Sequence, residues 1–511
     1  MFSSRYDSVM IRTQHLLCKT DQVRSLEEGA IAGGRTAEAL METAGRAAFR
    51  ALRQRWPHAQ FITVYCGKGN NGGDGYVLAR IAQDSGLSVR LVSLGDPTTP
   101  EAAAAKHRAL SAGLVSERHS NELLNETEVV VDALLGIGVS GNLREPMASI
   151  VSDINQSSPA CLSLDIPSGL NADTGSAVGG AVSAEMTVTF IRNKPGLMTG
   201  EGPDYAGRVI LEDLQVFDRL DIDQPLSTAW GFCLDESWVS QNMPLRRNSA
   251  HKGNAGHVLV VGGGPGMPGA PVLAGCAALR MGAGRVSIAC HPDSLPAASF
   301  CPELMVKAVK DTEDLSRLLP DTDVVVIGPG LGQTVWAKAM YGVCVENTGR
   351  KVIDADALNL LARDPRTLAL SVLTPHPGEA GRLAALSPKE VQVSRPEVSE
   401  TLAEKFNATC VLKGAGTLVA RPGHPVMLCD RGHSGMATPG MGDVLSGIIG
   451  ALMAQGAPEH VAAGAGVWCH AVAAERAGAA AGRLGMCASD LNPYLRELRS
   501  EIPLRQYRHG R

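Results

Sequence analysis

Short apolar runs recur along the first 215 residues, and glycine, proline or polar residues bound each run. The runs are FITVYC, SVRLVSL, TEVVVDALL, ACLSLDI, MTVTFI and GRVILEDL. They are typical of buried strands, and helical patterns lie among them. In residues 36–56 the apolar positions recur near every 3.6 residues, at Leu40, Met41, Ala44, Ala48, Phe49 and Leu52. The alternation predicts an α/β domain whose parallel sheet is covered by helices on both faces.

The alternation of apolar runs with helical patterns stops between about residues 215 and 250, where the chain is polar and irregular. Apolar runs resume at GHVLVVGGG and continue to ATCVLKGAGTLVA, and the last part of the chain has helical patterns. The sequence therefore predicts two α/β domains of three layers each, at residues 1–222 and 226–511. We find no repeat between the halves, so two different chemistries are expected.

Composition narrows the class of protein. A chain of 511 residues with 44% hydrophobic residues can bury two cores. The net charge of −5 and the lack of a long basic run argue against a nucleic-acid partner. The 12 cysteines form no C-x-x-C pair, the N-terminus has no apolar signal region, and no apolar run approaches a membrane span. We therefore expect a cytoplasmic protein with reduced cysteines and no membrane contact.

The segment YCGKGNNGGDGYVLAR, residues 65–80, is rich in glycine and asparagine where a strand gives way to a helix. Glycines let backbone amides approach a ligand closely, and the start of the following helix would present free N–H groups that suit an anion. Ligands of α/β sheets bind at the carboxyl ends of the strands. We interpret residues 67–75 as a ligand-binding loop rather than a long turn.

A second glycine-rich segment, GPGMPG at residues 264–269, matches the dinucleotide-binding pattern G-x-G-x-x-G. Pro265 and Pro268 remove two of the amides that such a site uses to bind a pyrophosphate. Dehydrogenase-type dinucleotide binding is therefore the alternative for this half of the chain, not the preferred interpretation.

Ordered motifs in both halves resemble one enzyme family. The first half resembles the NAD(P)H-hydrate epimerase domain, through GKGNNGGDGYVLAR, VVVDALLGIGVSGNLR, LSLDIPSGLNADTG and TVTFIRNKPGL. The second half resembles the ADP-dependent NAD(P)H-hydrate dehydratase of the ribokinase-like superfamily, through HKGNAGHVLVVGG, VVIGPGLG, VIDADALNLL, LTPHPGEAGRL, VLKGAGTLVA and GMATPGMGDVLSGIIGAL. The resemblance implies a Rossmann-like first domain, a ribokinase-like second domain, and a bifunctional enzyme that repairs hydrated NADH and NADPH (NADHX and NADPHX).

For the first domain, the resemblance implies an epimerase that interconverts the R and S forms at C6 of the hydrated nicotinamide ring. A potassium ion (K⁺) would be held by Asn71, Asp132 and Ser168. The hydrate would contact Asn70, Asn71, Gly72, Gly73, Asp74, Gly136, Ile137, Gly138, Val139, Ser140, Gly141, Asn142 and Asp165.

The residue types agree with these implied roles. A monovalent cation binds several oxygens, few of them charged, and one carboxylate, one amide and one hydroxyl meet that need. Asp132 alone would also suit a turn or a helix cap, but three oxygens at strand ends favour a ligand site. Asp165, in the segment DIP, is expected to have an extended backbone and to handle the proton. Lys194 matches a family lysine, but a surface lysine would fit equally well.

For the second domain, the resemblance implies ADP-dependent dehydration of the S form, with Mg²⁺ accompanying ADP and with AMP and phosphate released. The segment Gly440 to Asp443 would form an anion hole, with Asp443 as the catalytic base and also as a cap of its helix. Met441 stands where many members have Thr and lacks the hydroxyl, so a side-chain contact there is not expected, whereas binding through the backbone N–H is unaffected. The hydrate would contact Ala255, Gly330, Gly332, His376 and Asp443, and the nucleotide would contact Lys413, Gly414, Ala415, Gly416, Thr417 and Gly442.

Three classes of function remain open at this point. The favoured class is the hydrate repair enzyme, a homo-oligomer whose partners are the small molecules NADHX, NADPHX and ADP. The second is a ribokinase-like kinase of a vitamin alcohol with an accessory N-terminal domain, which the same Gly-x-Gly-Asp would serve. The third is a nucleotide sensor without turnover, and the presence of both Asp165 and Asp443 argues against it.

Overall fold

A computed structural model describes residues 11–138, 141–217, 229–298 and 301–509. The chain divides into two compact units, an N-terminal unit Ile11–Phe232 and a C-terminal unit that contains Cys233–Arg511. The division lies about ten residues beyond the expected boundary at 222–226, which itself lies outside the described residues.

The N-terminal unit contains a seven-stranded sheet in the order β4-β3-β2-β5-β6-β7-β8, and every pair in it is parallel. All six predicted apolar runs form strands of this sheet, which confirms the prediction. The strands are β2 (Phe61–Cys66), β3 (Ser88–Ser93), β4 (Ser116–Glu117), β5 (Val129–Ala133), β6 (Ala160–Leu164), β7 (Met186–Phe190) and β8 (Arg208–Glu212). The strand order reverses between β2 and β5, and this switch point is where α/β sheets bind ligands.

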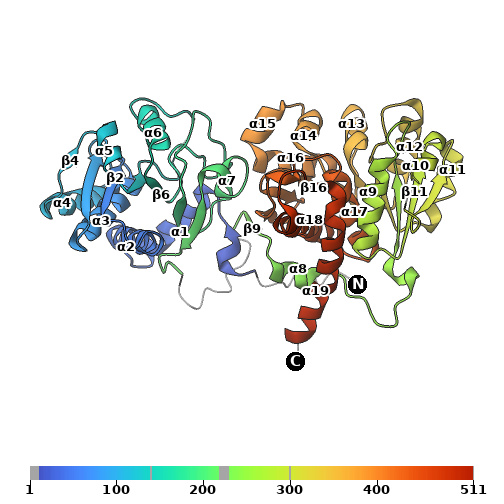
Figure 1. Ribbon diagram of the computed structural model, residues 1–511, viewed down its shortest axis with the longest axis horizontal. Helices are drawn as coiled ribbons and strands as arrows, with labels where there is room; N and C mark the ends of the chain where they lie inside the picture. Colours follow the sequence, from blue (N-terminus) through green and yellow to red (C-terminus); the bar gives the residue numbers. More distant parts are fainter. Residues whose placement is uncertain (1–10, 139–140, 218–228, 299–300, 510–511) are drawn as a thin grey trace. The chain divides into compact units, whose positions relative to one another are not determined.

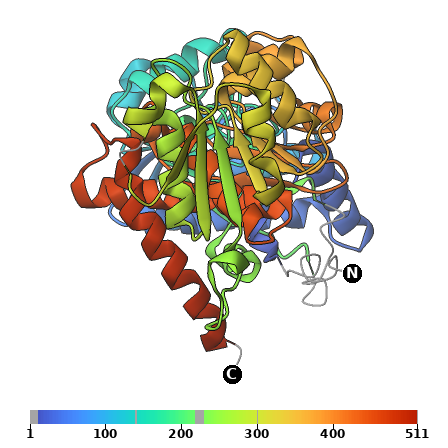
Figure 2. The ribbon, with the colours of Figure 1, turned by 90° about the vertical axis from the view of Figure 1, so that its right-hand side faces the viewer.

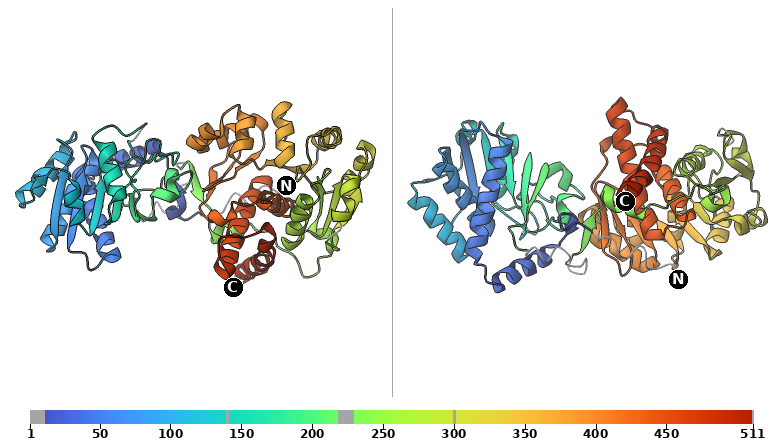
Figure 3. Two further views of the ribbon diagram at one scale, coloured as in Figure 1. Left: turned by 45° about the horizontal axis from the view of Figure 1, so that its top comes forward. Right: turned by 90° about the horizontal axis from the view of Figure 1, so that it is seen from below.

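Helices cover both faces of this sheet (Figure 1; Figure 3). They are α1 (Thr20–Ala32), α2 (Ala37–Arg55), α3 (Asn70–Asp84), α4 (Pro100–Ser111), α5 (Asn121–Asn125), α6 (Met147–Gln156) and α7 (Gly202–Tyr205). On one face α2, α3 and α4 pack against side chains such as Ile62 and Val64 of β2. On the other face α5 and α6 pack against Tyr65 of β2 and Val130 of β5. Adjacent residues of one strand thus enter opposite cores, as the period of two requires.

The C-terminal unit has a larger sheet in the order β18-β17-β16-β15-β14-β13-β10-β11-β12. The strands from β16 to β12 are parallel, and β17 and β18 are antiparallel to their neighbours. The strands are β10 (His257–Val261), β11 (Arg285–Cys290), β12 (Met305–Ala308), β13 (Val324–Ile327), β14 (Arg350–Ile353), β15 (Ser371–Leu373), β16 (Thr409–Leu412), β17 (Thr417–Ala420) and β18 (Val426–Cys429). The order reverses between β10 and β13. Two short strands, β1 (Leu16–Leu17) and β9 (Gly231–Cys233), pair antiparallel with Leu16 opposite Phe232.

Helices also flank the strands of this unit (Figure 2). They are α8 (Glu236–Asn242), α9 (Gly269–Arg280), α10 (Leu295–Ala298), α11 (Thr312–Ser316), α12 (Val335–Glu346), α13 (Ala355–Arg363), α14 (Pro377–Ala384), α15 (Pro388–Val393), α16 (Arg395–Phe406), α17 (Met441–Ala454), α18 (Glu459–Ala481) and α19 (Asn492–His509). Short 3₁₀ turns span Thr13–His15, Pro195–Leu197, Lys252–Ala255, Pro292–Ser294, Leu319–Asp321, Ser434–Met436 and Ala488–Leu491. Among the described helices, none is both long and apolar enough to cross a membrane.

Helix α17 packs closely against α9, and glycine makes the contact possible. A Cβ atom at Gly447 would lie 2.0 Å from the Ala274 carbonyl oxygen, far inside van der Waals contact. A Cβ at Gly450 would lie 2.6 Å from a methyl group of Val326 in β13. These glycines weaken the helix by roughly 1 kcal/mol each relative to alanine, but they fix the position of its first turn above the sheet.

Candidate active sites

The glycine-rich segment after β2 is helical for most of its length. Helix α3 begins at Asn70, so only residues 67–69 form a loop, and the prediction of a loop over 67–75 is wrong. The glycines serve packing instead. A Cβ at Gly72 would lie 2.1 Å from the Gly67 carbonyl oxygen, and one at Gly73 would lie 2.4 Å from the Met41 side chain. The segment therefore brings the first turn of α3 against the end of β2 and against α2.

A cavity of about 380 Å³ opens at this carboxyl edge of the N-terminal sheet. Residues from α1 and α2, the start of α3, and the loops after β5, β6 and β7 line it. The predicted residues that it brings together are Asn70, Asn71, Asp74, Gly136, Ile137, Gly138 and Asp165. Its position at the strand-order switch point agrees with the rule for ligand sites in parallel sheets.

Asp165 lies at the end of β6 and forms a buried ion pair with Lys194. Its Oδ1 accepts a hydrogen bond from Lys194 Nζ at 2.5 Å, and the lysine also donates to Thr189 Oγ1 at 2.9 Å and to the Phe190 carbonyl at 2.7 Å. The Lys194 side chain is completely buried, which excludes the alternative of a surface lysine. The φ angle of Asp165 is 63°, so the expected extended backbone is wrong: Ile166, not Asp165, directly precedes the proline.

Two further carboxyl groups face the same cavity, Asp74 of α3 and Glu27 of α1. Burial raises the pKa of Asp74 well above its usual value, and the negative charges of Asp165 and Glu27 raise it further. Burial also raises the pKa of Glu27, with Asp165 as the largest charge contribution. The sequence reasoning missed Glu27, because α1 carries no motif and only its fold brings it to the cavity.

The candidate cation ligands lie together at the ends of β5 and β6. Asp132 is fully buried, and its Oδ1 accepts from Ser168 Oγ at 2.6 Å while its Oδ2 accepts from the Ser168 amide and from Ser163 Oγ, each at 2.8 Å. The Asn71 side-chain amide donates to the Leu135 carbonyl at 2.8 Å. Asn71 Oδ1 is buried and has no hydrogen-bond donor in the described part of the chain.

Only the first part of the predicted substrate loop, residues 136–142, is placed at the cavity. Gly136 lies beside Asn71 and Asp165, with a Cβ there 3.3 Å from Asn71 Cβ and 3.6 Å from Asp165 Oδ2. Val139 and Ser140 lie outside the described residues. Gly141 and Asn142 do not line the cavity, and Asn142 contacts Gly179 instead.

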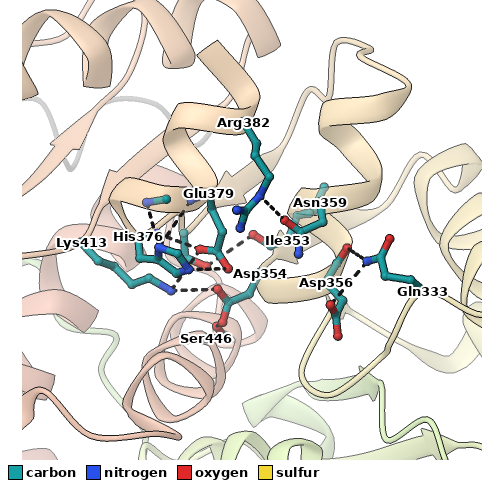
Figure 4. A network of polar contacts seen from close by, with 12 residues as sticks. Gln333, Ile353, Asp354, Asp356, Asn359, His376, Glu379, Arg382, Lys413 and Ser446 are labelled. Atoms are coloured by element: carbon teal, nitrogen blue, oxygen red, sulfur yellow. Dashed lines mark hydrogen bonds and ion pairs between the residues drawn. The ribbon is translucent and has the colours of Figure 1, made fainter. Parts of the chain in front are cut away.

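In the C-terminal unit, a polar cluster lies at the carboxyl edge of β14, β15 and β16 (Figure 4). Lys413 Nζ donates to Asp354 Oδ1 at 3.0 Å and lies 3.9 Å from Glu379 Oε2. Asp354 is almost completely buried and also accepts from Ser446 Oγ of α17 at 2.5 Å. Burial raises the pKa of Asp354, but Lys413 and Ser446 overcome that effect and lower it overall. The carboxylate thus stays charged and connects the lysine to α17.

Asp443 lies in the first turn of α17, above this cluster. Its pKa is raised to about 7, by burial first and then by the negative charge of Asp354. The helix N-cap is Gly440, with φ of 89°, and no side chain caps the helix, so the prediction that Asp443 caps it is wrong. The helix's own hydrogen bonds begin with the Val444 amide donating to the Gly440 carbonyl at 3.1 Å. The preceding amides, including that of Gly442, therefore have no partner within the helix.

The segment Lys413 to Thr417 forms the tight turn between β16 and β17. Gly414 and Gly416 have φ angles of 138° and 60°. Arg395 of α16 is completely buried under the turn and donates to the carbonyls of Leu412, Lys413 and Gly416 at 3.2–3.3 Å. Burial lowers the pKa of Arg395 to about 10. The motif specified the turn but gave no sign of the arginine, which lies 18 residues earlier than Lys413.

His376 caps α14. Its Nδ1 accepts from the amides of Gly378 at 3.0 Å and Glu379 at 3.4 Å. Because Nδ1 is an acceptor, the neutral imidazole carries its proton on Nε2, and burial together with Lys413 lowers the pKa of His376. The side chain is 52% exposed, and its Nε2 lies 3.4 Å from Glu379 Oε1. Beside it, burial raises the pKa of Glu379 to about 7.

The loop after β13 approaches the loop after β10 at this edge. A Cβ at Gly330 would lie 2.6 Å from the Met267 carbonyl oxygen and 3.1 Å from Ala270 Cβ. The Gly332 amide donates to Asp356 Oδ2 at 2.7 Å, which connects this loop to the cluster of Figure 4. The segment GPGMPG therefore lies at the candidate site, although its prolines argue against a dinucleotide fingerprint.

Ala255 is not brought to this cluster. It precedes β10, and the neighbouring Gly256 lies against the last turn of α17, where a Cβ would be 2.2 Å from the Ala454 carbonyl oxygen. Asp443 lies in the first turn of the same helix, whose 14 residues span about 20 Å. Ala255 thus lies near the other end of α17 from Asp443, and its expected contact with the hydrate stays a prediction.

Comparison with known proteins adds independent findings. Residues 258–497 match a family described as NAD(P)H-hydrate dehydratase, and residues 37–196 match the YjeF-related protein N-terminus. A bifunctional NAD(P)H-hydrate repair enzyme Nnr of Coxiella burnetii is 45% identical over 94% of this chain and 99% of its own length. The enzyme of that name from Escherichia coli is 40% identical over 93% of this chain and 92% of its own length. A solved structure of a hypothetical protein from Streptococcus mutans covers 53% of this chain and its own full length, at 27% identity and a TM-score of 0.50.

Proposed function

The chain belongs to the family of bifunctional NAD(P)H-hydrate repair enzymes, and on that premise we propose how its two sites divide the chemistry. The N-terminal Rossmann-like unit epimerises the hydrated cofactors, and the C-terminal ribokinase-like unit dehydrates them to NAD(P)H. The observation that carries this conclusion is the 45% identity with a repair enzyme over nearly the whole chain.

In the proposed epimerase site, the hydrate contacts residues 70–74, residues 136–138 and Asp165. The cavity supports this, because Asn70, Asn71, Asp74, Gly136 and Asp165 all line it. Asp165 handles a proton of the reacting hydroxyl at C6. Lys194, buried beside it, keeps the carboxylate oriented and supplies a compensating positive charge.

The proposed K⁺ ligands are Asn71, Asp132 and Ser168. They fit the ion because Asn71 Oδ1 is a buried oxygen without a donor among the described residues, and because the Asp132 carboxylate and the Ser168 hydroxyl are hydrogen-bonded to each other. The Leu135 carbonyl, which accepts from Asn71, is a further oxygen at the same place. Bound K⁺ would supply a fixed positive charge that orients the first turn of α3 and the substrate hydroxyl.

In the proposed dehydratase reaction, ADP transfers its terminal phosphoryl group to the C6 hydroxyl of the S hydrate, and Asp443 accepts the hydroxyl proton. The C6–O bond then breaks, phosphate leaves with the electron pair, and loss of a proton from C5 gives NAD(P)H, with AMP as the other product. A pKa of about 7 leaves Asp443 partly ionised at neutral pH, as a general base requires. The free amides at the start of α17, including Gly442, stabilise the transferring phosphoryl group.

The nucleotide is proposed to bind residues 413–417, and the hydrate to contact Gly330, Gly332, His376 and Asp443. The His376 Nε2–H, which lies beside Glu379 Oε1, would donate to a substrate oxygen. Mg²⁺ with ADP fits the cluster, because Asp354, Glu379 and Asp443 supply carboxyl oxygens, the ligand type that Mg²⁺ prefers. Mg²⁺ would neutralise the phosphates there.

The decisive experiment incubates the purified chain with ADP and a mixture of both NADHX epimers and follows the absorbance of the reduced nicotinamide. Full recovery is expected, in a fast phase for the S form and a slower phase limited by epimerisation. A kinase of an unrelated alcohol would instead need ATP and leave NADHX unchanged, and a sensor would bind without turnover. We also propose that the protein is a homo-oligomer, which light scattering would test. We propose a cytoplasmic location, and the free cysteines of the structure are consistent with such a reducing compartment.

A further inference from the structure

Glu27 is an acidic group of the epimerase cavity that none of the family motifs includes. It lies on α1, is half-buried, and lines the cavity together with Asp165 and Lys194. Its carboxyl group forms no hydrogen bond or ion pair within the part of the chain that the structure describes, whereas the Asp165 carboxylate accepts from Lys194 at 2.5 Å. A half-buried carboxyl without a partner, facing a ligand cavity, is costly for stability and typical of a functional group.

The surroundings of Glu27 favour its protonated form. The charged groups around it are Arg24 and Glu28 of α1, Asp74 of α3, Glu101 of α4, Asp165 after β6 and Lys194 after β7. Burial raises the pKa of Glu27, the charges of Asp165 and Glu101 raise it further, and Lys194 opposes them. The carboxyl groups of Asp165 and Glu27 therefore differ in environment, because Asp165 is ion-paired with Lys194 and Glu27 is unpaired among the described residues. Such a difference is usual for a base that acts beside an acid.

Such a pair can epimerise C6 without oxidation. C6 carries the hydroxyl and is bonded to N1, so the hydroxyl can leave only if it gains a proton. The C6–O bond then breaks, water leaves with the electron pair, and the N1 lone pair forms a C6=N1 double bond. A water molecule adds to the opposite face of C6, the electron pair returns to N1, and a base takes the proton of that water. Atoms and electrons balance without a further reactant.

We propose that Glu27 is the second catalytic acid–base residue of the epimerase, the proton donor to the leaving C6 hydroxyl, acting with Asp165 as its complementary base. This rests on the proposed epimerase site. Asp165, held by Lys194, also places a negative charge beside the cationic intermediate. Asp74 is a less suitable donor because it is 9% exposed at the start of α3, whereas the half-buried Glu27 can regain a proton from solvent after each turnover.

The test uses the full-length chain with purified R-NADHX and no ADP, and separates R from S by chromatography. Glu27→Gln is expected to lower the epimerisation rate constant by roughly 10²–10⁴-fold with KM within about threefold, the contribution typical of a general acid. The wild-type rate should fall as pH rises through the Glu27 pKa, and this decline should be absent in the variant. Glu28→Gln, the exposed neighbour on α1, is the matched control and should retain the wild-type rate. Dehydration of S-NADHX with ADP reports folding and should be unchanged in both.

Several results would overturn the proposal. A rate within threefold of wild type for Glu27→Gln removes Glu27 from the chemistry, and a large loss confined to Asp74→Asn moves the role to Asp74. Epimerisation in ¹⁸O-labelled water must place ¹⁸O on C6, so retention of ¹⁶O would exclude cleavage of the C6–O bond. If the wild-type chain does not convert R to S at all, the epimerase site itself is misassigned and Glu27 is not the cause.

Discussion

Asp443→Asn should make the C-terminal unit inactive and more stable at the same time. The pKa of Asp443 is raised from 3.8 to about 7, mainly by burial and by Asp354. A carboxyl whose pKa is higher in the folded state destabilises the fold at high pH, and the effect vanishes below the unfolded pKa. The shift of about three pKa units corresponds to roughly 4 kcal/mol above pH 7, at 1.36 kcal/mol per unit. Asparagine has nearly the same shape but no charge, so it removes this cost.

The pH dependence gives the sharpest form of this prediction. The variant should exceed the wild type in stability by up to about 4 kcal/mol at pH 8, and the gain should shrink to about 0.5 kcal/mol at pH 4, near the unfolded pKa. No helix cap is lost, because Gly440 and not Asp443 is the N-cap. Thermal unfolding without nucleotide, at both pH values, measures the difference. Glu404→Gln, which removes an exposed carboxylate from α16, controls for the loss of one negative charge.

The same variant tests the catalytic role. Loss of a general base should lower dehydration by roughly 10²–10⁴-fold, and ADP affinity should stay within a few-fold because backbone amides and residues 413–417 hold the nucleotide. Epimerisation should be unaffected. Equal stability of variant and wild type at pH 8 would show that folding does not raise the pKa of Asp443. Normal dehydration by the variant would show that Asp443 is not the catalytic base. A large loss of ADP affinity would make it a binding residue.

Three further predictions follow from the two sites. Asp132→Ala should weaken epimerisation and be partly rescued by high potassium, since it removes the one charged ligand; equal rates in sodium, potassium and no added salt would show that the cation site is misassigned. Arg395→Met should remove the hydrogen bonds that Arg395 donates to three carbonyls of the turn, at a cost of about 1–3 kcal/mol. The Kd for ADP, measured by calorimetry, should rise by about tenfold. Unchanged affinity would show that the shape of the turn does not determine nucleotide binding. The boundary between fragments 1–222 and 226–511 interrupts no described helix or strand. The first fragment should therefore keep epimerisation and the second should keep dehydration. If both fragments fold but neither is active, the assignment of one complete site to each half is wrong.

The sequence alone determined the layers of both units. Every apolar run of the first half became a strand, and the apolar period of residues 36–56 became the buried face of α2, because periodicity and burial are local properties of the chain. The motifs also located the two loop edges, since glycine and asparagine are needed where the backbone turns sharply or approaches closely. Local pattern failed at the boundary between loop and helix: the glycines after β2 lie inside α3, where close packing against Gly67 and Met41 requires them.

Only the tertiary structure decided which side chains share a site. The sequence left open whether Lys194 is a site residue or a surface lysine, and the structure buries it completely against Asp165 because the loop after β7 returns beside the end of β6. Glu27 and Arg395 belong to helices without motifs, and they reach the cavity and the nucleotide turn only through helix packing. Ala255 lies in a motif, but its neighbour Gly256 packs against the last turn of α17, whereas Asp443 lies in the first turn. Contacts between residues far apart in sequence depend on strand order and helix packing, which no local pattern specifies.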